Sequence, residues 1–548
     1  MKCKVVIALV VACALLLAAA VALGAEKKKG EQVFIYACSG DAARLDPADV
    51  TDGESIQRCD NMFEGLLEFK PNSTELQPGL ATSWQVSSDG KELTFNLRRG
   101  VKFHDGTDFN ADAVVFSFAR QYDKDSEYNK FGEWAYWGYM FTDIDRVEKI
   151  GDYKVKIFMK RPNASIMTSL AMFTVAIVSP ANAESLKEDA FKNPVGTGPF
   201  KFVEWVKDDH ITLEAYDGYW KGRPAIDKII FRVIPDPSAR LLALEAGEVH
   251  GMEYPNPADF DRIKANKKLT LMSEPGMNVG YMAINAGYGY TDANKNGRKD
   301  ADEPWEKTPG YYEPLTKVKV RQAINMAIDK KSIVKNLYKG TAIAAKNGMP
   351  PFMLGYNDKV QDWPYDPARA KKLLAEAGYP NGFEVTLHVM PVSRPYMFDP
   401  PKIGEAIQSY LGAVGIKVNF YQVDWGTYLQ EAEAGKHQMC LLGWTGDNGD
   451  PDNFMNVLYG PNAAKIGTSG NYGFYNDMKA QELLSAATAT FDVKKRAELY
   501  QKAQEMIHES ANWVYIAHAN QSLVFRANVK GFKMNPTSRM FFYPITIE

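Results

Sequence analysis

The chain has few cysteines and histidines and lacks the short motifs of common enzymes. Among 548 residues there are 5 cysteines and 7 histidines, and no GxSxG, P-loop, HExxH or CxxC pattern occurs. The histidines are scattered without the spacing of metal ligands. Acid pairs such as Asp208 with Asp209, or Asp447 with Asp450, have the residue types of a glycosidase, but equally those of ordinary turns. A secreted hydrolase is therefore kept as an alternative from a different functional class.

An excess of charge of either sign is also missing. The formal net charge is −3, which leaves no basic surplus for gripping a phosphate backbone, so we expect no nucleic-acid partner. With 45% hydrophobic and 24% charged residues, the composition is that of an ordinary globular protein. The length is enough for about two to four domains.

Long hydrophobic runs are absent except at the start. Lys2 and Lys4 precede an uncharged stretch that ends in small residues, which is the pattern of a secretory signal, so we predict a cleaved signal peptide over residues 1–25 and a periplasmic protein. An uncleaved anchor is an alternative, because the run is long enough to span a bilayer. A lipoprotein cleavage before Cys13 would leave too short an apolar segment upstream.

The few cysteines limit the possible disulfides. Removal of the signal leaves Cys38, Cys59 and Cys440 in an oxidising compartment. Cys38 and Cys59 lie in the same short N-terminal region, whereas Cys440 lies on a strand that looks buried. We therefore predict a Cys38–Cys59 disulfide and one free thiol.

Short β patterns alternate with helical ones, which favours an α/β fold. Asp-Gly pairs at 89–90 and 105–106 flank alternating apolar residues and predict hairpin turns. Asp366 followed by Pro367 predicts a helix start, with Gly378 as its stop. A period near 3.6 residues predicts a second helix over residues 320–338.

Two loops carry isolated charges of opposite sign. GWTGDNGDPDNF at 443–454 follows a short apolar strand and places Asp447 just beyond it, while MPVSRPY at 390–396 offers Arg394 between two prolines. Fixed charges of opposite sign suit a small zwitterion such as a free peptide. The alternative for the first stretch is a plain Asp/Asn/Gly/Pro turn.

Seven stretches in order carry a family resemblance. They are LATSW (80–84), GVKFHDG (100–106), ADAVVFSFAR (111–120), NPVGTGPF (193–200), YPNPADF (254–260), MPVSRPY and GWTGDNGDPDNF. On these motifs the chain resembles the periplasmic dipeptide-binding proteins of peptide ABC importers, within the family 5 peptide and nickel solute-binding proteins. The resemblance implies a receptor without enzymatic activity and without a cofactor needed for function. It also implies a two-lobed periplasmic-binding-protein fold, type II-like, of the large peptide-binding group.

The resemblance further implies how the chain is divided. Lobe I would comprise residues 26–65, 190–275 and 519–548, with an extra α+β subdomain inserted at 66–189. Lobe II would comprise residues 276–518, and the ligand would lie in the cleft between the lobes, a frequent place for small-molecule sites.

The implied ligand is a dipeptide held at both ends. Asp447 would pair with its α-ammonium and Arg394, with its planar fork, with its α-carboxylate. Gly443 and Trp444 would offer backbone groups to the peptide, and Tyr396 would line the carboxylate pocket. The partners would be inner-membrane ABC permease subunits, and the receptor would be a monomer. Longer peptides, haem or nickel complexes are alternatives within the same family.

One stretch, residues 287–314, is an insertion relative to that family. It contains DANKNGRKDADE, which satisfies the EF-hand calcium-loop pattern. The predicted ligands are Asp292, Asn294, Asn296, the Arg298 carbonyl, Asp300 and Glu303, with Gly297 at the turn. We predict a structural Ca²⁺ that stabilises the edge of lobe II without taking part in peptide capture; the alternative is an acidic, flexible insertion.

Overall fold

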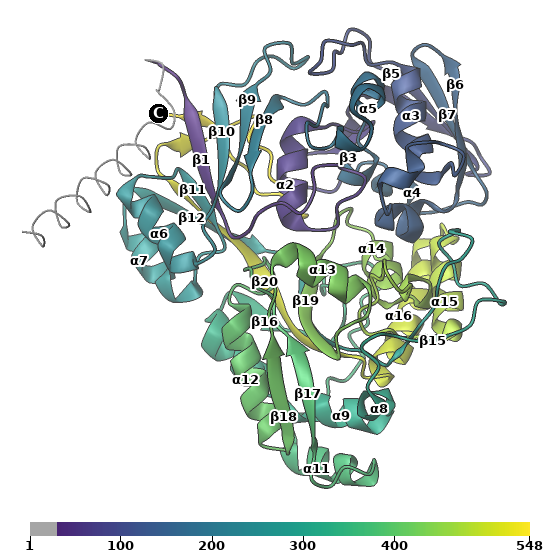
Figure 1. The fold of residues 1–548 in the computed structure, drawn as a ribbon, viewed down its shortest axis with the longest axis vertical. Helices are drawn as coiled ribbons and strands as arrows, with labels where there is room; N and C mark the ends of the chain where they lie inside the picture. The colour runs from purple at the N-terminus through teal and green to yellow at the C-terminus, as the bar shows by residue number, and fades with distance from the viewer. Residues whose placement is uncertain (1–29) are drawn as a thin grey trace, which may run out of the picture.

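The computed structural model describes residues 30–548 (Figure 1). The predicted signal peptide, 1–25, lies outside the described residues. Within the described part, no helix is both long and apolar enough to cross a membrane.

The largest element is a twelve-stranded mixed sheet that runs through the molecule. Its main path, in spatial order, is β18 (Ile416–Tyr421), β17 (Phe383–His388), β19 (Met439–Thr445), β13 (Asn278–Ile284), β20 (Trp513–Arg526), β11 (Gly251–Glu253), β1 (Val33–Cys38), β10 (Lys228–Val233), β9 (His210–Ala215) and β8 (Phe200–Val206); β12 (Leu269–Pro275) and β16 (Ala342–Ala344) also pair with β20. We call the part around β1 and β8–β12 the upper body and the part around β13 and β16–β19 the lower body, as they lie in Figure 1.

The fourteen-residue strand β20 joins these two bodies. Its first half pairs with β13, from Trp513 opposite Ala283 to Ala517 opposite Gly280. Its second half pairs with β12, from Asn520 opposite Pro275 to Arg526 opposite Leu269. The chain passes between the bodies a second time between β12 and β13, so two neighbouring segments make the crossing.

A separate sheet lies beside the upper body. It has the order β4 (Ala81–Val86), β5 (Glu92–Leu97), β7 (Lys154–Met159) and β6 (Ile144–Gly151), and α3 (Ala111–Tyr122) packs on it. We call residues 66–189 the small unit. The predicted turns are confirmed: Gly90 and Gly106 adopt positive φ of 68° and 84° at tight turns, which glycine tolerates without strain.

One predicted helix is confirmed and the other is divided. Asp366 accepts a hydrogen bond from the Arg369 N–H and caps α11 (Pro367–Glu376), and Gly378 follows with φ of 95°. The predicted helix over 320–338 is instead α9 (Val318–Ala327), α10 (Lys330–Ile333) and a π-helical turn, η6 (Val334–Tyr338). Ile328 is extended, and Asp329 caps a new start by accepting from the Ser332 N–H. The apolar period continues across this break, which is why periodicity alone missed it.

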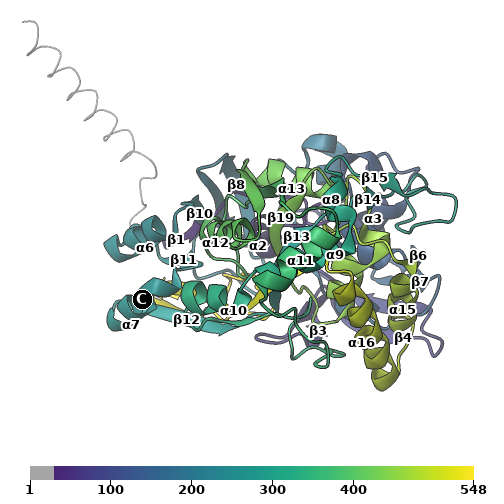
Figure 2. The ribbon, with the colours of Figure 1, turned by 90° about the horizontal axis from the view of Figure 1, so that it is seen from below.

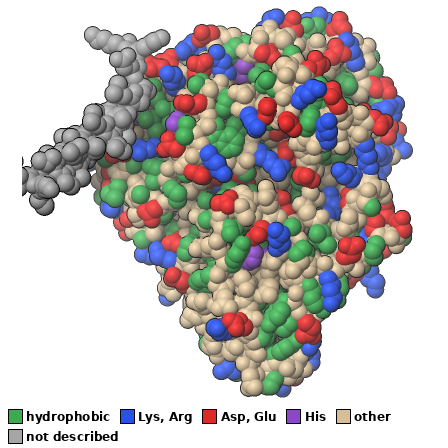
Figure 3. Space-filling view, in the orientation of Figure 1, with side chains coloured by type: hydrophobic (Ala, Val, Ile, Leu, Met, Phe, Trp, Pro, Cys, Tyr) green, Lys and Arg blue, Asp and Glu red, His purple; other side chains and the backbone are tan. Residues whose placement is uncertain are grey.

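Longer helices cover the lower body and its flank. They are α12 (Pro400–Gly412), α13 (Trp425–Glu433), α15 (Met478–Thr488) and α16 (Val493–Glu509), while α2 (Gly53–Met62), α6 (Pro237–Ala246) and α7 (Phe260–Ala265) belong to the upper body. Figure 2 shows α15 and α16 packed side by side. The buried residues of α16 recur at helical spacing, so one stripe faces the core. On the face shown in Figure 3, basic and acidic side chains are interspersed over both bodies.

The predicted disulfide is not present. Cys38 and Cys59 are both buried free thiols, as is Cys440. The Cys38 Sγ points to the Tyr36 carbonyl and the Cys59 Sγ to the Leu45 carbonyl, each at 3.6 Å. The two thiols therefore face different neighbours, and closeness in sequence was not enough to bring them together. Burial raises the pKa of each thiol well above its usual value, which keeps them protonated.

Candidate functional site

A cavity between the two bodies brings the predicted peptide-binding residues together. Its walls include all five of the predicted residues, Arg394, Tyr396, Gly443, Trp444 and Asp447. The upper body contributes Asp52 and Gly53 at the start of α2, and the small unit contributes Tyr136. Three regions far apart in the sequence thus enclose one space.

Asp447 lies just beyond the end of β19 and is 7% exposed. Its Oδ2 accepts hydrogen bonds from the Tyr136 hydroxyl at 2.8 Å and the Asn453 amide at 3.0 Å, while Oδ1 has no protein donor among the described residues. Burial raises the pKa of Asp447 to about 6, against the opposing effect of these two donors. A buried carboxylate with one unpaired oxygen is the arrangement that a cationic ligand group requires.

Arg394 lies in the loop after β17 and is 3% exposed. Its Nη1 donates to Glu54 Oε1 at 2.9 Å, and its guanidinium stacks 4.2 Å from the centroid of the Trp425 ring. Nη2, in contrast, is buried without a hydrogen-bond partner and lies 3.9 Å from Asp52 Oδ1. Burial alone would lower the pKa of Arg394, but the Glu54 carboxylate raises it above its usual value. The orphan N–H groups at Nη2 leave room for an anionic ligand group.

The aromatic floor of the cavity depends on two glycines. Gly443 in β19 pairs with Gly280 in β13, and Tyr396 lies over both. A Cβ on Gly443 would meet the Val279 carbonyl at 2.3 Å and the Tyr396 ring at 2.4 Å, and one on Gly280 would meet the Tyr396 carbonyl at 2.7 Å. Trp444, 8% exposed, donates its indole N–H to Asn453 Oδ1 at 2.9 Å. The small residues thus allow Tyr396 to approach the sheet.

Several residues of the site were not anticipated from the sequence. They are Tyr136, Asn453, Asp52, Glu54 and Trp425. Asn453 lies in the same motif as Asp447, so its position six residues later was an available signal. The others come from distant segments, and no local pattern marks them.

Asp450, a second acid of the same motif, has both of its carboxylate oxygens bonded elsewhere. Both of its oxygens bind Arg496 of α16 at 2.7 Å. The pairing fixes the loop after β19 against α16. Asp447 and Asp450 therefore do not form the acid pair of a glycosidase.

The predicted calcium loop is folded but does not assemble a ligand cluster. Asp292 accepts from the N–H groups of Asn296 and Gly297, and Glu303 accepts from those of Ala293 and Asp300. The amides of Asn294 and Asn296 donate to Asp300 Oδ2, each at 2.7 Å, and the Arg298 side chain is directed to Asp143. Within residues 30–548, no group of three or more His, Cys, Asp or Glu side chains is placed to hold a metal ion. The carboxylates are engaged by the loop's own donors.

These features define a class of protein. Residues 75–466 match the model of bacterial extracellular solute-binding proteins, family 5 Middle, so the chain belongs to this family of solute-binding receptors and is not an enzyme. The two-lobed fold of that family agrees with the mixed sheet and its two bodies.

The similar proteins agree with this assignment. The chain is 39% identical over 533 residues to the dipeptide-binding protein of Escherichia coli, covering 94% of this chain and 95% of that one. It is 36% identical over 538 residues to heme-binding protein A of Haemophilus influenzae, covering 95% and 93%. Among solved structures it resembles the periplasmic binding protein DppA of Helicobacter pylori in complex with the peptide STSA, with a TM-score of 0.84, 34% identity and coverage of 94% and 98%.

Proposed function

We propose that the protein is a periplasmic receptor that captures dipeptides and delivers them to an ABC importer. The observation that carries the proposal is that one cavity is lined both by a buried acid, Asp447, whose two side-chain donors bond a single oxygen, and by a buried arginine, Arg394, whose Nη2 has no hydrogen-bond partner. A free peptide presents one ammonium and one carboxylate, and each needs an opposite partner when water is removed. The relatives named for dipeptide binding support the same ligand class.

Both charges come from the lower body, so their separation is set before the cavity closes. A ligand that satisfies both must have its termini at that separation, which selects peptide length and leaves the side chains free to vary. Gly443 and Trp444 of β19 line the space between the two charges, where backbone groups of a sheet strand suit an added extended peptide. Tyr396 completes the apolar wall.

The decisive experiment is incubation with a library of free dipeptides and tetrapeptides, followed by removal of unbound peptide and mass spectrometry of what the protein retains. We expect intact dipeptides. Retention of tetrapeptides only, in the manner of the STSA complex of the relative, would replace the dipeptide assignment by a longer-peptide one. A Soret band after haem addition, displacing the dipeptide, would favour the ligand of the haem-binding relative.

The division into lobes is also a proposal. Residues 26–65, 190–275 and 519–548 would form lobe I with the small unit attached, and 276–518 would form lobe II. The two crossings at β20 and between β12 and β13 support these limits. Export through the signal at 1–25, a monomeric state and docking on inner-membrane permease subunits complete the proposal. Mass spectrometry of the exported protein, showing a new N-terminus near residue 26, tests the signal.

The structural Ca²⁺ rests on sequence spacing alone. Rotation of the Asn294 and Asn296 amides would turn their oxygens toward Asp300, which is the change that calcium would require of this loop. The ammonium of the buried Lys465, whose Nζ lies 3.8 Å from Asp292 Oδ2, would also have to move away from a calcium ion bound there. We expect weak binding, with a dissociation constant of about 10⁻⁴ to 10⁻³ M, as in extracellular modules. Calorimetric titration of calcium into the wild type and into Glu303→Gln tests this expectation. If millimolar calcium gives no heat of binding with the wild type, the loop does not bind calcium.

A further inference from the structure

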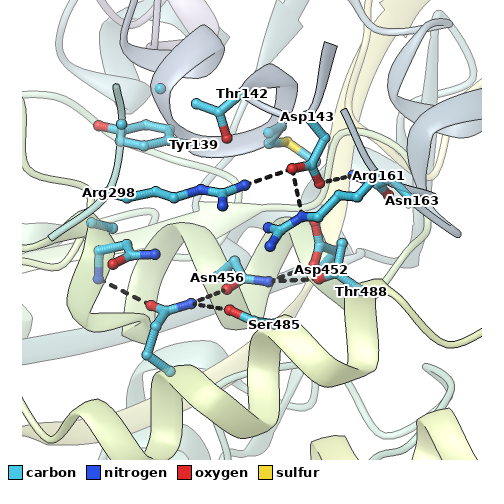
Figure 4. A pocket seen from close by; sticks show the side chains of 16 residues that line it. Tyr139, Thr142, Asp143, Arg161, Asn163, Arg298, Asp452, Asn456, Ser485 and Thr488 are labelled. Carbon is cyan, nitrogen blue, oxygen red and sulfur yellow. Dashed lines mark hydrogen bonds and ion pairs between the residues drawn. The ribbon is translucent and has the colours of Figure 1, made fainter. Parts of the chain in front are cut away.

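The insertion at 287–314 leaves the lower body and contacts the small unit. Its base is a two-stranded ribbon, β14 (Tyr288–Gly289) with β15 (Glu306–Lys307), tied to the lower body by the Tyr290 hydroxyl donating to the Asn462 carbonyl at 2.7 Å. Its tip reaches across: Arg298 Nη2 bonds Asp143 Oδ1 at 2.6 Å, and Lys124 donates to the Asn294 carbonyl. Figure 4 shows Arg298 extending toward Asp143.

The fit at the tip depends on a glycine. A Cβ on Gly297 would lie 2.5 Å from Thr142 Cγ2 and 2.8 Å from the Gly138 carbonyl, both in the small unit. The loop backbone therefore rests directly on the turn that precedes β6. This close approach places the Arg298 side chain beside Asp143 rather than in solvent.

Asp143 has its charge satisfied without Arg298. It is 5% exposed on its side chain and also binds Arg161 Nε at 2.7 Å and the Asn163 amide at 3.2 Å, both within the small unit. Arg161 Nε and Arg298 Nη2 both donate to Asp143 Oδ1, as the dashed lines of Figure 4 show. The bond to Arg298 is therefore an added contact between the lower body and the small unit, because Asp143 already has two partners inside the small unit.

The position of Asp143 links this contact to the peptide cavity. Asp143 follows Tyr136 by seven residues in one compact turn, and Tyr136 is the small-unit residue that donates to Asp447. Asp447 and Arg394 are both at most 7% exposed, so a peptide enters or leaves only when the cavity walls separate. Movement that takes Tyr136 away from Asp447 also takes Asp143 away from Arg298.

We propose that the insertion is a clasp: Arg298, bound to Asp143, holds the small unit closed over the peptide cavity and slows peptide release. Arg298 is thus a positioning residue for a ligand that it does not touch. The inference rests on the proposed peptide function, and it replaces the expectation that the insertion is independent of peptide capture. A contact made only in the closed state shifts the open–closed equilibrium by its own free energy.

The test is stopped-flow or surface-binding kinetics with the dipeptide Ala-Leu as probe. Arg298→Gln should raise the dissociation rate about 3- to 10-fold, the range expected for one charge-assisted bond discounted for partial exposure, with a nearly unchanged association rate. Arg298→Lys should restore part of the loss. Lys295→Gln, the same charge change at an exposed position of the same loop, is the matched control and should behave as wild type.

Two further readouts separate the clasp from a merely structural role. The dissociation rate of the wild type should rise with salt more steeply than that of Arg298→Gln, because screening weakens the ion pair that the variant lacks. The melting temperature of the peptide-free protein should be the same for both. Equal dissociation rates in wild type and Arg298→Gln overturn the clasp, as does unfolding of the variant; failure of the wild type to bind any dipeptide overturns the peptide function instead.

Discussion

At the residue scale, one loop shows how neighbours decide what an acid does. Asp447 and Asp450 are three residues apart, yet Asp450 is neutralised by a bidentate arginine while Asp447 receives only neutral donors on one oxygen. Glu54 shows the opposite case, since Arg58 and Arg394 both bind it. The cost of a buried charge is met differently in each case: arginines bind Asp450 and Glu54, whereas uncharged donors bind Asp447.

The raised pKa of Asp447 predicts a pH dependence of binding. Burial raises the pKa of Asp447 to about 6 in the folded protein, so the ligand-free protein loses the Asp447 proton only as pH rises through about 6. An ammonium ligand needs the ionised form. Dipeptide affinity should fall as pH drops below 6, approaching about tenfold per unit. Calorimetry from pH 8 to 5 checks this. Asp447→Asn should bind weakly at every pH and lose this dependence; an unchanged slope in that variant contradicts the assignment.

The proposed pairing of Arg394 with the peptide carboxylate predicts how a change in the protein and a change in the ligand combine. Arg394→Ala should weaken Ala-Leu by about 3 to 5 kcal/mol, because a ligand carboxylate would be buried unpaired. Amidation of the peptide's C-terminus should weaken wild-type binding as well, yet cost little more in the variant, since the two changes remove the same contact. Calorimetry on the wild type and on Arg394→Ala, each with the free and the amidated peptide, checks this. If the two losses of binding free energy add, Arg394 does not hold the carboxylate. The variant is also expected to melt lower, because Glu54 loses one of its two arginines.

At the scale of elements, the meeting of β13 and β19 is built around the small residues that accept Tyr396. Gly280 and Gly443 face each other in the antiparallel register. Their lack of side chains makes the space in which the aromatic wall of the cavity lies. This feature of two strands shapes the site without supplying any polar contact.

This packing predicts opposite effects for two glycine substitutions. Gly443→Ala places a methyl group within 2.5 Å of both the Val279 carbonyl and the Tyr396 ring, so it should lower the free energy of unfolding by about 2 to 3 kcal/mol. Gly412→Ala, at the end of α12 with nothing within 4 Å of the new Cβ, should stabilise by up to about 1 kcal/mol. Urea denaturation of both variants checks the pair. A neutral Gly443→Ala would contradict the close packing.

At the scale of the whole molecule, the cavity that we propose as the peptide site exists because three regions meet. The lower body holds both charged residues, the upper body contributes the start of α2, and the small unit contributes Tyr136. A ligand held between bodies stabilises their closed arrangement and not the unfolded chain. Its effect on stability therefore follows from mass action.

This arrangement predicts that ligands raise the melting temperature only when both peptide termini are free. A free dipeptide at 100 times its dissociation constant should add about 2.7 kcal/mol to the free energy of unfolding. N-acetylated or C-amidated versions at the same concentration should give little shift, because each leaves Asp447 or Arg394 without its partner. Differential scanning calorimetry with the three ligands checks this. Equal shifts for free and blocked peptides would show that the termini are not what the protein recognises.

The sequence by itself determined the family and the α/β class, and it singled out Arg394 and Asp447, which the fold brings to one cavity. The reason is local: ordered motifs, turn glycines and N-caps such as Asp366 act over a few residues and are visible in a linear chain. It also placed Gly443, Trp444 and Tyr396 beside those charges. The predicted disulfide was wrong, because nearness in sequence does not fix the direction of two side chains.

Only the tertiary structure decided what surrounds those residues. Tyr136 at Asp447, Glu54 at Arg394, and Asp143 at Arg298 come from segments 155 to 340 residues away, and no local pattern encodes such pairs. Which oxygen or nitrogen remains free for a ligand depends on these partners, because hydrogen bonding and burial act through space. The sequence contains the charged groups, and the packing of three regions brings them to one cavity.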